Sequence, residues 1–121
     1  MAKKPTEYKK FIVKITQNAE NDLNEIMNYI SQNNPRTALV IMERIISKIE
    51  SLDQFPYRGG YVPELLARNI KDFRKITETP WNIYYKINDN IVNVLAVIDS
   101  RRNFKDILIN KLLGNEAAHF F

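Results

Sequence analysis

Residues 81 to 102 read WNIYYKINDNIVNVLAVIDSRR, and this stretch decides the fold. Apolar and polar residues alternate from Ile83 to Ile87, as in a strand with one buried and one partly exposed face. Asp89-Asn90 then supplies a tight turn, because both residue types tolerate a positive φ. The returning segment, Ile91 to Ile98, is apolar on both faces. We therefore expect a β-hairpin whose second strand is central and covered on both sides.

The second strand of this hairpin leads directly into a pair of arginines, Arg101 and Arg102. Strict alternation assigns one face of the strand to Ile91, Leu95 and Val97, and the other to Val92, Val94, Ala96 and Ile98. Two guanidinium groups thus follow the most rigid element of the chain. They are either part of a binding site or a solvated strand end.

The whole chain has 121 residues, the size of one domain with a single core. It has no cysteine and one histidine, so thiol chemistry, disulfides and a His-rich metal centre are not expected, and no cofactor is implied. No apolar run is long enough for a membrane span, and we expect a soluble, cytoplasmic protein without membrane contact. The expected organisation is a flexible basic tail over 1–10, one domain over 11–114 and a C-terminal tail over 115–121.

The net charge of +4 is distributed unevenly. Residues 1–10 hold four lysines against one glutamate, and residues 68–105 hold eight basic residues against four acidic ones. The positive charge therefore gathers on the tail and the strands. This indicates an acidic partner, nucleic acid or protein, on the sheet side. The alternative is that each base only protects a sheet edge from aggregation.

The first half of the chain predicts one strand and two helices. A β-branched run over 11–15 predicts the strand, and Thr16 or Asn18 can cap the helix after it. Asn34-Pro35 is a start signal for a second helix reaching about Asp53, with asparagine as N-cap and proline at the first helical position. Both helices carry an apolar stripe, which we expect to pack against one face of a sheet. Residues 55–60 should be irregular.

The second half predicts a helical turn, three strands and a last helix. The turn lies at 63–68 and the first strand at 70–78, where Phe73 and Ile76 break strict alternation and suggest a bulge or a sharp twist and leave the register open. After the hairpin, Asn103 caps a helix that ends near Gly114. The fold class is therefore α+β: an N-terminal strand and helical hairpin packed on a mainly antiparallel four-stranded sheet, with a C-terminal helix.

The candidate site residues are bases and one tyrosine on or beside the sheet. They are Arg74, Lys75, Tyr84, Lys86, Arg101 and Arg102. If the sheet curls, the arginines can converge on one concave face and bind phosphates or carboxylates. Tyr84 could then stack on a nucleobase of unpaired RNA. The alternative pairs Arg101 and Arg102 with Asp99 and Asp106 and places Tyr84 at the edge of the core.

Acid-base groups for catalysis are less evident than cations. A metal-free nuclease needs a general base for a ribose hydroxyl and an acid for the leaving oxygen. Glu78 and Asp99 are conceivable bases, whereas His119 lies in the C-terminal tail. Trp81, after Pro80, is expected to pack in a turn. Metal-ligand spacings and phosphate-binding glycine loops are absent from the sequence.

Five segments, in this order and spacing, resemble the RelE/ParE superfamily of bacterial toxins from type II toxin-antitoxin modules. They are ITQNAENDLNEIMNYISQNNPRTA (15–38), SLDQFPYRGG (51–60), IKDFRKI (70–76), PWNIYYKI (80–87) and NVLAVIDSRRNFKDIL (93–108). The double arginine after the last strand, followed by a helix, is similar to the ParE branch. The resemblance spans about residues 11–113.

This resemblance implies a toxin that arrests growth, stabilises plasmids and is neutralised by a cognate antitoxin. ParE-like toxins poison DNA gyrase, whereas RelE-like toxins cut messenger RNA on the ribosome. For the ribonuclease, Arg74, Arg101 and Lys75 are the nearest matches to the family's cations. The tyrosine that RelE-type nucleases carry near the C-terminus is replaced by apolar residues such as Phe104 and Leu108. This departure favours a gyrase inhibitor over an endoribonuclease; an inactive antitoxin-binding relic is the third alternative.

Overall fold

The computed structural model describes residues 10–101 and 111–113, and the expected tails lie largely outside them. Within this part the chain forms five strands, three α-helices and a helical segment at 111–113. The helices are α1 (Gln17–Ser31), α2 (Pro35–Glu50) and α3 (Pro63–Leu66). The strands are β1 (Ile12–Ile15), β2 (Gly60–Tyr61), β3 (Phe73–Glu78), β4 (Trp81–Asn88) and β5 (Ile91–Asp99). Short 3₁₀ turns occupy Ser51–Asp53 and Pro56–Arg58.

The sheet has the strand order β1-β5-β4-β3-β2 and is mixed. β1 runs parallel to β5, and the other neighbours are antiparallel. The α+β class is confirmed, with five strands instead of the four expected. The additional strand is β2, where Gly60 and Tyr61 pair with Lys75 and Arg74. A two-residue strand beginning with glycine has no alternation that a sequence pattern could reveal.

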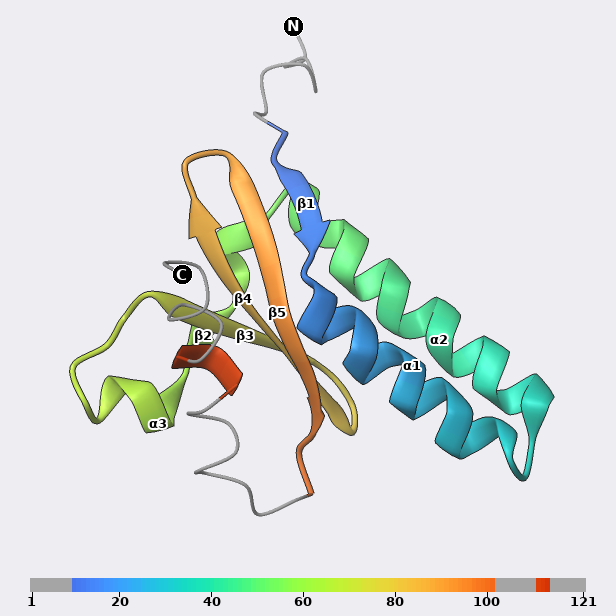
Figure 1. The fold of residues 1–121 in the computed structure, drawn as a ribbon. Helices are drawn as coiled ribbons and strands as arrows, with labels where there is room; N and C mark the ends of the chain where they lie inside the picture. The colour runs from blue at the N-terminus through green and yellow to red at the C-terminus, as the bar shows by residue number, and fades with distance from the viewer. Residues whose placement is uncertain (1–9, 102–110, 114–121) are drawn as a thin grey trace, which may run out of the picture.

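Helical segments lie on both faces of the sheet (Figure 1). α1 and α2 lie side by side on one face, and their apolar stripes pack against residues such as Ile83 and Val94. α3 and Leu112 lie on the other face, in a second cluster that includes Phe73 and Leu95. The expectation that β5 is central and covered on both sides is confirmed. The sheet therefore separates two apolar cores.

The helix starts follow the expected capping chemistry. Thr16, not Asn18, caps α1: its hydroxyl accepts from the Ala19 N–H and donates to the carbonyl of Val94. Asn34 caps α2 through the Thr37 N–H, and Pro35 occupies the start of the helix. The expected last helix falls on residues 103–110, outside the described part, although 111–113 are helical.

A β-bulge lies in β5 and not in β3. The register shifts where Tyr84 is opposite Ala96 and Tyr85 is opposite Val94, so Leu95 is the extra residue. Beyond the bulge, Val97 joins the core under the helices, and Ile98 joins the opposite core with Leu95. The face assignment by strict alternation is therefore wrong for this strand.

The pairing of β3 with β4 is uninterrupted, so the bulge expected near residues 70–78 is absent from this pair. Phe73 and Ile76 lie on opposite faces, one in each core. Their spacing of three reflects a strand buried on both sides, which needs no irregularity.

Asp22 on α1 accepts a backbone hydrogen bond from β5 at a point where β1 has already ended. This carboxylate is buried, accepts a hydrogen bond from the Val97 backbone N–H at 3.0 Å, and pairs with Lys111 Nζ at 2.7 Å. The Val97 N–H lies past the residues of β5 that pair with β1. The Asp22 side chain thus replaces a strand partner at that position.

Replacing Asp22 with alanine should lower the free energy of unfolding by about 1–3 kcal/mol, because a buried N–H loses its acceptor. Asp22→Asn should cost less, since the amide oxygen can still accept from Val97. Urea denaturation of both variants measures the difference, with the exposed neighbour Asn24→Ala as control. Equal stability of Asp22→Ala and the wild type would contradict this role.

Candidate partner-binding surfaces

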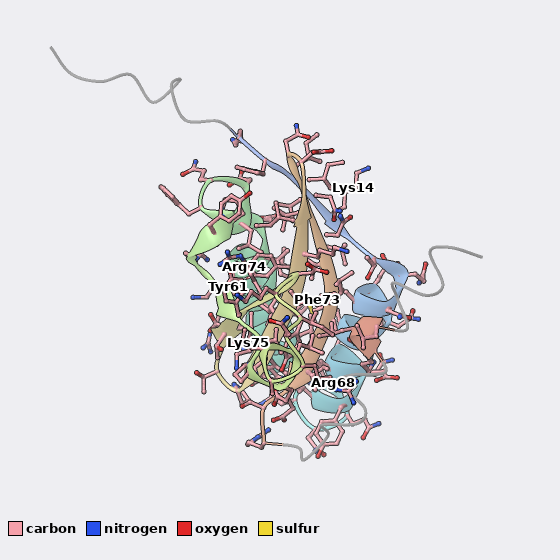
Figure 2. All side chains as sticks on the ribbon, turned by 90° about the vertical axis from the view of Figure 1, so that its left-hand side faces the viewer. Lys14, Tyr61, Arg68, Phe73, Arg74 and Lys75 are labelled. Carbon is pink, nitrogen blue, oxygen red and sulfur yellow. The ribbon has the colours of Figure 1, made fainter. Side chains whose placement is uncertain are left out.

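Arg74 on β3 is fixed at the β2 edge of the sheet. Its Nη1 atom donates to the carbonyl of Gly59 at 2.6 Å and to the carbonyl of Tyr57 at 3.2 Å. Its guanidinium carbon lies 5.2 Å from the ring centroid of Tyr57 and 4.7 Å from that of Tyr61. Both distances are within the range of cation–π contacts. Figure 2 shows Arg74 and Tyr61 next to each other on one margin of the sheet, with Lys14 on the opposite margin.

Gly59 allows this loop to approach the sheet closely. Its N–H donates to the Tyr85 hydroxyl, which in turn donates to the carbonyl of Pro56 at 2.6 Å. A Cβ at residue 59 would collide with that hydroxyl and would lie 2.8 Å from the Lys75 carbonyl oxygen. The glycine is therefore required by the space available, since its φ of −74° is open to any residue.

Lys75 and Lys86 lie on the sheet face opposite to Arg74. Alternation along β3 places Arg74 with Ile76 on the side of α2, and Lys75 on the side of Phe73. Lys86 pairs with Phe73 across the strands, and its Nζ lies 5.7 Å from the Phe73 ring centroid. These bases therefore belong to different surfaces.

Tyr84 is not available to stack on a ligand, which corrects its assignment as a binding residue. Its side chain is 2% exposed and lies in the core beneath α3. The hydroxyl accepts from the Asn82 side chain at 3.3 Å. Burial raises the pKa of Tyr84 above its usual value, a shift that the Asn82 hydrogen bond partly offsets, so the phenol stays protonated at neutral pH.

Arg101 lies beyond the end of β3 that is farther from Arg74. Trp81 is opposite both Glu78 and Asp99, so Arg101 lies past the β3 terminus, which is about 13 Å along the strand from Arg74. The expected convergence of the arginines on one face is therefore wrong. Arg102 and Asp106 lie outside the described residues.

Arg101 forms a two-pronged ion pair with Asp99. Its Nε and Nη2 atoms donate to the two carboxylate oxygens at 2.9 and 2.6 Å. The hydrogen bonds to Asp99 raise the pKa of Arg101 above its usual value, and the guanidinium stays charged. The side chain nevertheless remains 72% exposed, so it can contact a partner.

A groove of about 780 Å³ separates α1 from the end of the hairpin. Its lining combines apolar and charged residues: Asp22, Glu25, Ile26, Tyr29, Ile30, Pro80, Trp81, Val97, Ile98, Asp99, Arg101 and Lys111. Trp81 follows the turn, is largely buried in the core and also lines the groove. Sequence patterns did not indicate the groove, because it forms where two separately predicted layers diverge.

The conceivable general bases are engaged by cations. Glu78 pairs with Arg44 at 2.6 Å and with Lys48 at 3.7 Å, and Asp99 pairs with Arg101. His119 lies outside the described residues. Over residues 10–101 and 111–113, the acidic and histidine side chains form no cluster suited to a metal ion. The same part of the chain has no helix long and apolar enough to cross a membrane.

Solved structures share this fold. The chromosomal ParDE toxin-antitoxin system from P. aeruginosa matches with 21% identity and a TM-score of 0.61, covering 74% of this chain and 95% of that one. The toxin-antitoxin complex RelBE2 from Mycobacterium tuberculosis matches with 20% identity and a TM-score of 0.52, covering 74% of this chain and 98% of that one. A search of the curated proteins found no match.

The fold is thus the one found in the ParDE and RelBE2 structures. The family model for the ParE toxin of the type II toxin-antitoxin system, parDE, matches residues 13–104, which is more than half of the chain. The chain belongs to this ParE toxin family.

Two neighbouring glycines allow a test of the loop that carries the arginine-tyrosine contacts. Gly59→Ala should lower the free energy of unfolding by about 1–3 kcal/mol, because the new methyl group collides with Tyr85 and the β3 backbone. Gly60→Ala is the matched control, since a Cβ there meets nothing within 4 Å. In thermal melts, Tyr85→Phe should cost less in the Gly59→Ala background than in the wild type. Equal costs of the two glycine substitutions would contradict the steric argument.

Proposed function

We propose that this protein is the toxin of a type II toxin-antitoxin module, acts on DNA gyrase in the cytoplasm, arrests growth and stabilises plasmids. The observation that carries the proposal is the match to the ParE family over residues 13–104. The geometry adds support, because the cations suggested for a ribonuclease lie apart. Arg74 and Lys75 project from opposite faces of β3, and Arg101 lies beyond the far end of the sheet.

The acid-base groups also favour gyrase inhibition over RNA cleavage. Glu78 and Asp99 are held in ion pairs, which lowers their availability as bases. Burial raises the pKa values of Tyr84 and Tyr85, so neither phenol readily gives up its proton near pH 7. A gyrase inhibitor that works by binding requires no such group.

A supercoiling assay with purified gyrase tests the target. We expect an excess of the protein to abolish most of the supercoiling activity, because each gyrase molecule that is bound by the toxin is removed from the reaction. Primer extension on messenger RNA from induced cells is the second measurement, and it should show no new codon-positioned cuts. Unchanged supercoiling together with such cuts would establish the ribonuclease instead. Unchanged supercoiling without cuts, in cells that keep growing, would indicate an inactive relic.

A cognate antitoxin is proposed to occupy the groove between α1 and the hairpin end. The solved ParDE and RelBE2 relatives are toxin-antitoxin systems, which supports such a partner. The groove offers apolar contacts along Ile26, Ile30 and Trp81, and Arg101 on its wall offers an exposed cation to an acidic segment.

Arg101→Ala should therefore weaken binding of the antitoxin by about tenfold, the effect of losing one moderately important interface residue. Arg36→Ala, at an exposed arginine in the first turn of α2, is the matched control and should leave the affinity unchanged. Isothermal titration calorimetry with the antitoxin encoded beside the toxin gene measures both. Equal affinities of the Arg101 variant and the wild type would remove Arg101 from the interface.

A further inference from the structure

The largest gathering of exposed aromatic rings in the described chain lies around β2, away from the groove. Phe55, Tyr57 and Tyr61 are 53%, 59% and 42% exposed, although aromatic side chains usually bury most of their surface. With Arg74 between two of the rings, they form the Tyr57–Tyr61–Arg74 cluster. None of these residues lines the groove proposed for the antitoxin.

The rings of the cluster are held in place before any ligand arrives. The guanidinium of Arg74 contacts both tyrosine rings, and Phe11 packs edge-on against Tyr57 with the ring centroids 6.0 Å apart. The backbone that carries Tyr57 is fixed by its carbonyl bond to Arg74 and by the neighbouring bonds of Tyr85. A ligand that stacks on these rings therefore loses little side-chain entropy.

Arg74 keeps part of its donor capacity for a ligand. Only Nη1 donates hydrogen bonds to the described residues, and both go to backbone carbonyls. The Nε and Nη2 atoms donate none within that part of the chain, and together they form an edge that fits two oxygens of a phosphate. Arg58 adds a second positive charge nearby, since the charges of Arg58 and Arg74 both act to lower the pKa of the Tyr85 hydroxyl.

We propose that the Tyr57–Tyr61–Arg74 cluster binds single-stranded nucleic acid. Bases stack on the exposed tyrosine rings, and the free edge of Arg74 contacts a backbone phosphate. A duplex is a poorer ligand, because its bases are already stacked on each other. Tyr57 belongs to the 3₁₀ turn at Pro56–Arg58 and Tyr61 to β2, and Figure 2 shows Tyr61 next to Arg74 on one margin of the sheet.

Fluorescence anisotropy with the full chain tests this proposal, using labelled oligo-dT and oligo-U of about 12 nucleotides, within the span of a single-stranded site. We expect saturable binding that is tighter than binding to a duplex of the same length, and the comparison of the two oligomers assigns the ligand to DNA or RNA. Tyr57→Ala should weaken binding about five- to hundredfold, whereas Tyr57→Phe, which keeps the ring, should restore it.

Leu39→Ala is the matched control, because Leu39 is 58% exposed, like Tyr57, but lies on α2 and is not part of the cluster. It should bind like the wild type. The proposal is overturned if binding does not saturate below about 100 µM, the weak end of non-specific binding. It is also overturned if Tyr57→Ala binds as well as Leu39→Ala, or if Tyr57→Ala weakens the antitoxin and not the oligonucleotide. Because the assay contains no gyrase, its failure leaves the proposed function untouched.

Discussion

The backbone of β5 must find hydrogen-bond partners along both of its edges, and the rest of the fold depends on how it does so. β4 supplies one edge over the full length, but β1 ends at Ile15 and pairs only as far as Val94. Thr16 and Asp22 continue the edge with side chains of α1, which bond to the Val94 carbonyl and the Val97 N–H. The position of α1 against the sheet is therefore set by polar contacts as well as by apolar packing.

The bulge at Leu95 has a comparable influence on the two cores. Without the bulge, Val97 and Ile98 would exchange faces of the sheet. Each core would then lose the side chain that now fills it and receive one of a different shape. With the bulge, β5 contributes Val94 and Val97, on either side of it, to the core under α1 and α2. The successive residues Leu95 and Ala96 both enter the core under α3. The groove is lined by Val97, Ile98 and Asp99, the part of β5 that continues past its pairing with β1.

Local signals in the sequence were enough for most elements. Asn34-Pro35 predicted the start of α2, and the alternation around Asp89-Asn90 predicted the hairpin, because capping and turn chemistry act within a few residues. The bulge and β2 were missed, since a register shift and a two-residue strand depend on the partner strand. Asp22 looked like any acidic residue in the first turns of a helix.

The candidate site was harder to predict than the fold, because it depends on which faces are covered. Tyr84 shares its face of the strand with Asn82 and Lys86, which are polar, so the pattern predicts a partly solvent-exposed face. That face is covered by α3 and Leu112, which are distant in sequence. Likewise, no local feature shows that Arg101 lies past the end of β3, well away from Arg74.

The Tyr85 hydroxyl has a consequence for the loop that carries Tyr57. It donates to the carbonyl of Pro56 and accepts from Gly59, and only a protonated phenol can do both. Burial raises its pKa above the usual value, although the Gly59 hydrogen bond opposes the rise. The proton therefore stays in place across the whole physiological range. The arrangement of the arginine and the aromatic rings at this edge is accordingly independent of cellular pH.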